Sequence, residues 1–212
     1  MVMQHRPTTI AFRRVSALLL MCCGRADAQG GAVRHGIWVN LAAGDGWAHM
    51  SSDGQPKGAT RNGSLFSFDL GWTFGSRVRA GVGASQWARE LGGGNEDWIT
   101  SYGVSAFVYP VAHRSVFLEA GAGGSYYARV HVPPDGERAD TTYLSGTGWG
   151  ATVAAGWDAR IGDVFTLRPR LAYAYGAPRT VRYADRTLLA THWKQRMVSV
   201  DVGIVLHPPD SW

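Results

Sequence analysis

The sequence predicts an all-β protein: an eight-stranded antiparallel up-and-down transmembrane β-barrel that follows a cleaved signal peptide. Three observations predict this fold. Eight segments alternate apolar and polar residues, the connections between them are alternately short and long, and a secretory signal stands in front of them. The alternation is clearest at 66–74, whose sequence FSFDLGWTF places a large apolar residue at every even position.

The first 28 residues have the three parts of a secretory signal. Arginines precede the apolar run 15–23, which is too short to span a membrane as a helix, and Ala26-Asp27-Ala28 forms the cleavage site. We therefore expect residues 1–28 to be a signal peptide and residues 29–212 to form one outer-membrane barrel domain. In the alternative, Cys23 is a lipidation site that follows Leu20.

The charge of the chain gives no reason to expect a nucleic-acid partner. The sequence holds 21 Lys+Arg and 16 Asp+Glu; the signal removes four arginines and Asp27, which leaves 17 against 15 and a net charge of +2. Both cysteines also lie in the signal, so the mature domain crosses an oxidising compartment without disulfides. It has no apolar run near the roughly 20 residues of a spanning helix, so it can cross a membrane only as a closed barrel.

The eight expected strands are joined by connections of two kinds. Those after the first, third, fifth and seventh strands are long and rich in Gly, Asp, Pro and Thr, whereas those after the second, fourth and sixth are short. This asymmetry places both termini on the short-turn, periplasmic side. The longest outer loops are expected at 45–62 and 176–192. The strands are predicted at 35–44, 63–74, 77–88, 98–109, 115–130, 144–160, 164–175 and 194–207.

The apolar face of these strands is predicted to contact lipid. Leu70, Val153, Leu167 and Ile204 should then point away from the barrel axis. A soluble antiparallel barrel also alternates, but there the same four side chains would form the core. Aromatic residues are expected at both membrane interfaces. They are Trp72, Phe74, Trp157 and Phe165 near the periplasmic side, and Trp98, Tyr102, Trp149, Tyr173 and Tyr175 toward the outer side.

The polar face carries equal numbers of acids and arginines, which predicts a charge network that fills the lumen. Arginine suits such enclosed pairs because its planar fork binds carboxylates through two hydrogen bonds. We expect Arg168 and Arg170 to pair at mid-depth with carboxylates among Asp69, Glu119 and Asp201. The alternative is eight separately solvated charges. The predicted network consists of Asp69, Arg77, Arg79, Glu119, Asp158, Arg168, Arg170 and Asp201, with Arg77, Arg79 and Asp158 near the base.

Three residues depart from the alternation. Pro169 falls on the lipid face inside the seventh strand, where its missing N–H predicts a β-bulge. Trp38 and Phe107 have the parity of lumen residues although they are large and aromatic, which indicates a local register shift.

Residues 34–207 resemble the small eight-stranded outer-membrane barrels of the OmpA/OmpX type, the outer membrane protein β-barrel domain family. The resemblance consists of the topology and the alternation. It implies a monomer in the bacterial outer membrane that contacts outer-membrane lipid and lipopolysaccharide. In that family the last strand is an assembly signal for the barrel assembly machinery; here 198–206 alternates, and Trp212 follows only after a Pro-Pro break.

The sequence contains no strong catalytic signal. A lipid A deacylase needs a His–Ser pair on the outer surface, and only His49 with Ser51 and Ser52 has a nearby hydroxyl on that side. His113 with Ser115 falls in a periplasmic turn. No Cys/His set indicates a metal, and 92–94 is a glycine loop without a following helix, so neither metal nor cofactor is expected.

The expected function is therefore that of a non-enzymatic barrel with a filled polar lumen, acting in envelope structure or in surface interaction and adhesion. The fourth outer loop contains Arg179, Arg182 and Arg186, together with Tyr183 and Trp193, which could contact lipopolysaccharide phosphates or an acidic partner. Ordinary solubilising loop composition is the alternative. Two other functions stay open. One is an outer-leaflet lipid A enzyme; the other is a channel for small apolar ligands, indicated by Trp38, Trp87 and Tyr127.

Overall fold

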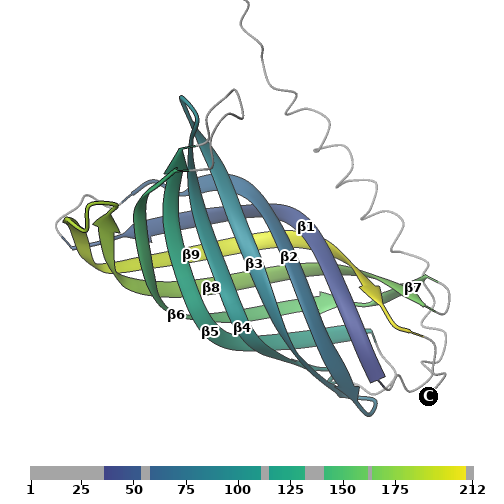
Figure 1. Ribbon diagram of the computed structural model, residues 1–212. Helices are drawn as coiled ribbons and strands as arrows, with labels where there is room; N and C mark the ends of the chain where they lie inside the picture. Colours follow the sequence, from purple (N-terminus) through teal and green to yellow (C-terminus); the bar gives the residue numbers. More distant parts are fainter. Residues whose placement is uncertain (1–35, 54–57, 111–114, 132–140, 162–163, 209–212) are drawn as a thin grey trace, which may run out of the picture.

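The computed structural model describes residues 36–53, 58–110, 115–131, 141–161 and 164–208. Within them no helix is long and apolar enough to cross a membrane. The described residues form antiparallel strands (Figure 1). The strands are β1 (Gly36–Ser51), β2 (Arg61–Phe74), β3 (Val78–Gly92), β4 (Asn95–Val108), β5 (Val116–His131), β6 (Thr141–Trp157), β7 (Ala159–Ile161), β8 (Phe165–Tyr183) and β9 (Leu188–Leu206).

The sheet closes on itself. β1 pairs with both β2 and β9, each strand from β2 to β5 pairs with its successor, and β6 pairs with β8. β7 pairs with β8 in the register that β6 sets, so β6 and β7 are two parts of one barrel strand. The predicted eight-stranded up-and-down barrel is therefore confirmed, and its closure leaves no long unpaired edge.

Pro169 explains why one barrel strand is divided. The ladder between β6 and β8 ends at Gly156 opposite Arg170, and it resumes as β7 with Ala159 opposite Leu167. The register is the same on both sides of the gap, so the predicted β-bulge at Pro169 is wrong. The proline lacks the N–H that the ladder needs at this point. On the β5 side the ladder continues through the gap, where the amide of Asp158 donates to the carbonyl of Ser115 at 2.9 Å.

The direction of the side chains separates the membrane barrel from the soluble one. Leu70 is 41% exposed, Val153 56% and Ile204 53%, and Leu167 lies half-buried on the same outward face. In a soluble barrel these side chains would be core. The belt continues around the barrel with other exposed large apolar residues, among them Ile37, Phe66, Val82, Val104, Leu118 and Val200. Such a belt is the surface that a transmembrane barrel presents to lipid.

The strands extend farther toward the outer side than the alternation predicts. β8 and β9 each contain 19 residues, whereas about 9–11 tilted residues cross a bilayer. The outer loops are correspondingly shorter than expected: 52–60 in place of 45–62, and 184–187 in place of 176–192. The second outer connection, between β3 and β4, is a tight turn at 93–94, where Gly92, Gly93 and Gly94 all have positive φ.

The aromatic residues predicted at the interfaces lie on the outward face. Trp72, Phe74 and Phe165 are exposed near the short-turn end, and Tyr102, Trp149 and Tyr173 are exposed toward the other end. Trp98, Trp157 and Tyr175 are partly buried. Trp149 on β6 and Tyr175 on β8 contact each other, with ring centroids 5.2 Å apart.

Trp38 and Phe107 require no register shift. Both side chains are fully buried inside the barrel, in pairings that run without irregularity through their positions. Space for the indole comes from two glycines on β2 and β3. A Cβ atom at Gly71 would lie 2.4 Å from Cζ2 of Trp38, and one at Gly81 would lie 3.0 Å from it. The predicted register shift is therefore wrong.

Several expectations fall outside the described residues. They are the signal peptide 1–28, the lipidation alternative at Cys23, His113 and Trp212.

Candidate functional site in the barrel lumen

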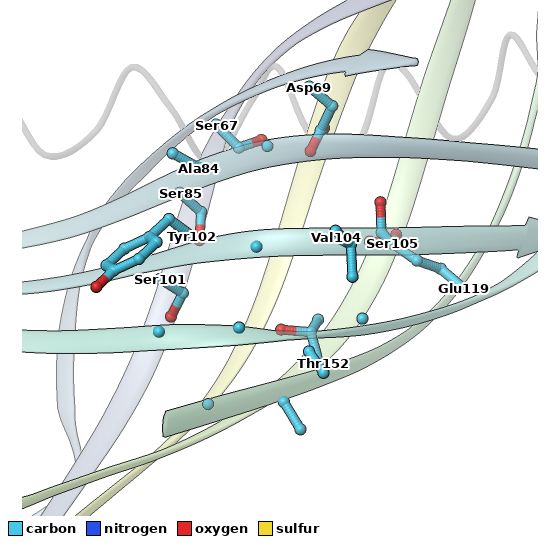
Figure 2. Close-up of a pocket in the computed structure, with 18 of the residues that line it drawn as sticks. Ser67, Asp69, Ala84, Ser85, Ser101, Tyr102, Val104, Ser105, Glu119 and Thr152 are labelled. Carbon is cyan, nitrogen blue, oxygen red and sulfur yellow. The ribbon is translucent and has the colours of Figure 1, made fainter. Parts of the chain in front are cut away.

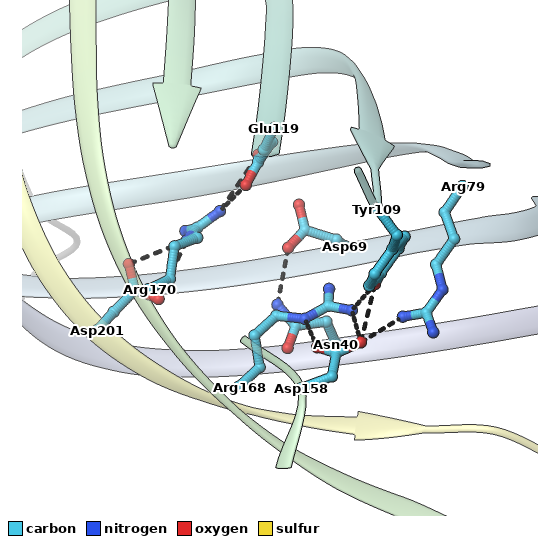
Figure 3. A network of polar contacts seen from close by, with 9 residues as sticks. All are labelled: Asn40, Asp69, Arg79, Tyr109, Glu119, Asp158, Arg168, Arg170 and Asp201. Carbon is cyan, nitrogen blue, oxygen red and sulfur yellow. Dashed lines mark hydrogen bonds and ion pairs between the residues drawn. The ribbon is translucent and has the colours of Figure 1, made fainter. Parts of the chain in front are cut away.

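The lumen near the short-turn end is closed by a charged cluster, the lower network (Arg79, Tyr109, Asp158 and Arg168; Figure 3). Asp158 is the common acceptor. Arg168 donates to its Oδ1 from Nε at 2.8 Å, Arg79 to its Oδ2 from a terminal nitrogen at 2.9 Å, and the Tyr109 hydroxyl to Oδ2 at 2.8 Å. All four residues are buried. Bonds that join charged groups away from water are among the strongest in proteins.

Aromatic rings surround the arginine of this network. The guanidinium carbon of Arg168 lies 5.6 Å from the ring centroid of Trp38, 5.1 Å from that of Phe107 and 5.0 Å from that of Phe117. These rings also contact one another edge to face. A cation over an aromatic face is stabilised when it is desolvated. The base of the lumen is therefore closed by packed rings as well as by ion pairs.

A second cluster, the middle network, consists of Asn40, Asp69, Glu119, Arg170 and Asp201 (Figure 3). Arg170 on β8 lies between two carboxylates: a terminal nitrogen is 3.0 Å from Glu119 Oε2, and Nε is 3.1 Å from Asp201 Oδ1. The amide of Asn40 donates to Asp69 Oδ2 at 2.9 Å. All five side chains are buried.

The structure places two of the predicted network residues differently from the expectation. Arg77 is exposed in the turn between β2 and β3 and does not belong to the lumen. Arg168 pairs with Asp158 at the base, not with Asp69, Glu119 or Asp201 at mid-depth. In the register that β6, β7 and β8 share, Asp158 lies opposite Arg168, so the two side chains meet across neighbouring strands.

Beside the middle network the lumen is lined by small residues. Strands β3 to β6 contribute glycine, serine and threonine here, and they leave a cavity of about 70 Å³ (Figure 2). One water occupies about 30 Å³ of liquid, so this space suits a few waters only. Its polar lining includes Ser67, Asp69, Ser85, Ser101, Ser105 and Thr152.

Toward the outer side the lumen is filled by an apolar group, the upper cluster. Trp87 is fully buried, and its Nε1 donates to the carbonyl of Gly46 at 2.8 Å. Tyr127 and Trp193 contact each other with centroids 4.8 Å apart. The core of this cluster is Ala48, Leu65, Trp87, Ile99, Tyr127, Leu144, Val181, Ala190, Trp193 and Met197. The apolar residues under the outer rim thus pack against one another.

Above the upper cluster lies an ion cluster that the sequence analysis missed. Asp97 is fully buried and accepts hydrogen bonds from three side chains. Arg129 Nε is 2.7 Å and the Tyr127 hydroxyl 2.8 Å from its Oδ1, and an Arg61 terminal nitrogen is 3.2 Å from its Oδ2. In the sequence, these three residues have the parity of inward-facing positions, which could have revealed the cluster. Positions 61 and 97 were assigned to connections, however, and 129 to the end of a strand.

The lower network, the middle network and the ion cluster around Asp97 are together balanced in charge. Arg61, Arg79, Arg129, Arg168 and Arg170 contribute five positive charges, and Asp69, Asp97, Glu119, Asp158 and Asp201 contribute five negative ones. The balance is not local: the lower network has one arginine in excess, and the middle network has two carboxylates in excess. Neutrality is therefore reached only along the whole lumen.

The arginines proposed for surface recognition lie partly in a strand. Arg179 and Arg182 belong to the outer end of β8 and Arg186 to the following turn, and all three are exposed. A terminal nitrogen of Arg182 donates to the Arg186 carbonyl at 3.0 Å. In the same turn, the amide of Thr187 donates to the Asp185 carboxylate and holds its pKa below its ordinary value. Trp193 is not part of this surface, because its side chain is buried in the lumen.

The candidate catalytic histidine is placed on a strand rather than in a loop. His49 lies in β1 opposite Arg196 of β9. Among the described residues, no hydrogen bond joins it to Ser51 or Ser52, and no group of three or more His, Cys, Asp or Glu side chains is arranged to hold a metal.

The comparisons with known proteins identify the fold. No protein-family model matches the chain, and no curated protein matches it in sequence. Among solved structures it is similar to Neisserial surface protein A, with a TM-score of 0.55 and 16% identity over 84% of this chain and 99% of that one. It is also similar to Ail, the attachment invasion locus protein of Yersinia pestis, with a TM-score of 0.50 and 11% identity over 79% and 97% of the two chains. Together with the exposed apolar belt, these likenesses show a small β-barrel of the bacterial outer-membrane type.

Proposed function

We propose that this chain is a non-enzymatic outer-membrane barrel with a closed lumen, which acts in envelope structure or through interactions of its outer surface. The observation that carries the proposal is the filling of the lumen at successive heights. The lower network and the upper cluster each consist of buried side chains in contact with one another, and the middle network consists of two buried groups, Arg170 with its two carboxylates and Asn40 with Asp69. Passage of a solute would have to separate all three.

The outer end of the barrel supports the surface role. Strands of up to 19 residues extend beyond the length that a bilayer requires, so ordered strand surface is presented outside the membrane. The solved structures that the chain resembles include one described as a surface protein and one described as an attachment invasion protein. We propose adhesion or partner binding at this end, in a monomer whose last strand is recognised by the barrel assembly machinery.

In planar lipid bilayers, the folded chain is expected to show no stable open-channel current. The reason is that buried side chains fill the lumen at the lower network and the upper cluster, and the cavity beside the middle network measures only about 70 Å³. A general porin inserted in the same bilayers is the positive control. Long-lived, porin-like conductance steps that scale with the amount of inserted chain would overturn the closed-lumen proposal.

The exposed arginines on β8 and its turn are proposed to contact lipopolysaccharide phosphates. Arg179→Gln with Arg182→Gln should weaken binding of lipopolysaccharide by up to about fivefold per residue, because one exposed ion pair contributes up to about 1 kcal/mol. Calorimetric titration at low and high salt measures this, and the difference should shrink at high salt. Arg77→Gln, in the opposite turn, is the matched control. Equal affinity in the double variant and the wild type would contradict the assignment.

A further inference from the structure

A second cavity lies at the outer mouth of the barrel, above the upper cluster. It measures about 110 Å³. Its walls come from the end of β1, the segment 58–61, β5 and β9, elements that are far apart in the sequence. The polar and aromatic side chains that line it are Ser51, Ser52, Arg61, Tyr127, Arg129 and Trp193.

Two polar groups in this wall have no hydrogen-bond partner in the part of the chain that the structure describes. The indole Nε1 of Trp193 and the hydroxyl of Ser52 are buried, and neither has a hydrogen bond among the described residues. Trp193 as a whole is buried, with its ring against Tyr127. A buried donor without an acceptor is costly. Both residues line the cavity, so an acceptor bound there would give a partner to either group once its side chain turns toward it.

The cavity also has an excess of positive charge. Arg61 and Arg129 both contact the single carboxylate of Asp97, which leaves one positive charge in excess. Asp97 is fully buried and does not line the cavity, whereas the side chains of Arg61 and Arg129 are 36% and 28% exposed. The arginines are therefore open to a ligand from outside, and the carboxylate holds them in position from below.

We propose that this outer-mouth cavity binds an oxyanion of the phosphate type. Its lining supplies two guanidinium groups, an indole N–H and serine hydroxyls, which are donors suited to the several acceptor oxygens of one small anion. Among the described residues that line the cavity, a cation would meet the two arginines and no carboxylate. An apolar ligand would leave the indole and hydroxyl donors unpaired. The site is separate from the exposed arginines of β8 and does not depend on the closed-lumen proposal.

The phosphate group can be presented in two ways: as free phosphate or a soluble phosphate ester, or as the phosphate of lipopolysaccharide. The first experiment uses inorganic phosphate with the full mature chain folded in detergent micelles. Isothermal titration measures the affinity, with sodium chloride of equal ionic strength as the blank. The indole N–H resonance of Trp193, assigned by its loss in Trp193→Phe, reports whether the anion reaches this cavity.

Wild-type protein should bind phosphate saturably, with a shift of the Trp193 indole resonance. Arg61→Gln should weaken the affinity roughly tenfold or more, as expected when one charge-assisted hydrogen bond is lost. Trp193→Phe replaces the indole by a smaller aromatic ring without the N–H, and should weaken calorimetric binding by a smaller factor. Arg196→Gln, at the same end on the outward face of β9, is the matched control and should bind as the wild type does. Heat-modifiable mobility on a denaturing gel verifies that each variant is folded.

The second experiment identifies the source of the phosphate group. Phosphatidylcholine vesicles with lipopolysaccharide are compared with vesicles without it. A shift of the Trp193 resonance only with lipopolysaccharide, reversed by inorganic phosphate, assigns a lipid-borne ligand. A shift of the Trp193 resonance only with free phosphate indicates a soluble ligand. The proposal is overturned if phosphate produces no saturable binding, if chloride moves the resonance equally, or if folded Arg61→Gln binds as tightly as Arg196→Gln.

Discussion

Asp158→Ala is expected to lower the free energy of unfolding by about 3–5 kcal/mol, the cost of leaving a buried ion pair without one partner. Asp158 accepts hydrogen bonds from Arg79, Arg168 and Tyr109, all of them buried. Its removal leaves two guanidinium groups without a carboxylate at the base of the lumen. Urea unfolding in lipid vesicles, followed by tryptophan fluorescence and by the heat-modifiable band, measures the change.

Two controls separate this effect from a general sensitivity of the barrel. Arg77→Ala alters an exposed turn at the same end and should change the stability by no more than about 0.5 kcal/mol. Arg168→Met combined with Asp158→Ala should be less destabilised than the sum of the two single variants, because the second change removes a charge that the first left unpaired. A loss below about 1 kcal/mol in Asp158→Ala would show that water reaches the base of the lumen.

The sequence predicted the fold well because one physical rule acts on every strand. Successive side chains of a β-strand point to opposite faces, so a barrel in lipid alternates along its whole length. The outward direction of Leu70, Val153 and Ile204 followed directly from that parity. The same rule correctly placed Trp38 and Phe107 inside, although their size had suggested a register shift.

What parity alone could not show is which inward residues meet. Trp38 fits because Gly71 and Gly81, on two other strands, leave space for its ring. Arg168 meets Asp158 because the register of neighbouring strands places the two residues opposite each other. Both facts depend on the register between strands, which the alternation within one strand does not determine.

The outer ion cluster was missed for a different reason. Beyond the lipid, the outward face of a strand no longer has to be apolar, so the alternation fades while the strand continues. Arg61 and Asp97 lie in such extensions of β2 and β4, which the sequence had assigned to connections. Arg129 lies near the end of β5, and its partner is Asp97. Because Asp97 was not predicted to face the lumen, no acid was predicted to pair with Arg129.

Val153→Arg is expected to lower the stability of the barrel in lipid by about 2–4 kcal/mol, since the charge must leave water and enter the hydrocarbon layer near its middle. Val153 is 56% exposed on β6 and lies several residues from either end of the strand. Leu70→Arg, on β2 across the barrel, should have an effect of similar size. Both are measured as the urea midpoint of refolded protein in phosphatidylcholine vesicles.

Depth distinguishes this prediction from simple loss of an apolar side chain. Phe74→Arg, at the last residue of β2, places the same charge at the interface and should cost only about 0–1 kcal/mol beyond the loss of the phenyl group. Matched alanine variants at Val153, Leu70 and Phe74 supply that correction. If the arginine penalty were equal at all three depths, the outward belt would not be in contact with a hydrocarbon layer. If lipid surrounds the exposed apolar face of the barrel, the loss of stability caused by arginine should rise from Phe74 to Leu70 and Val153.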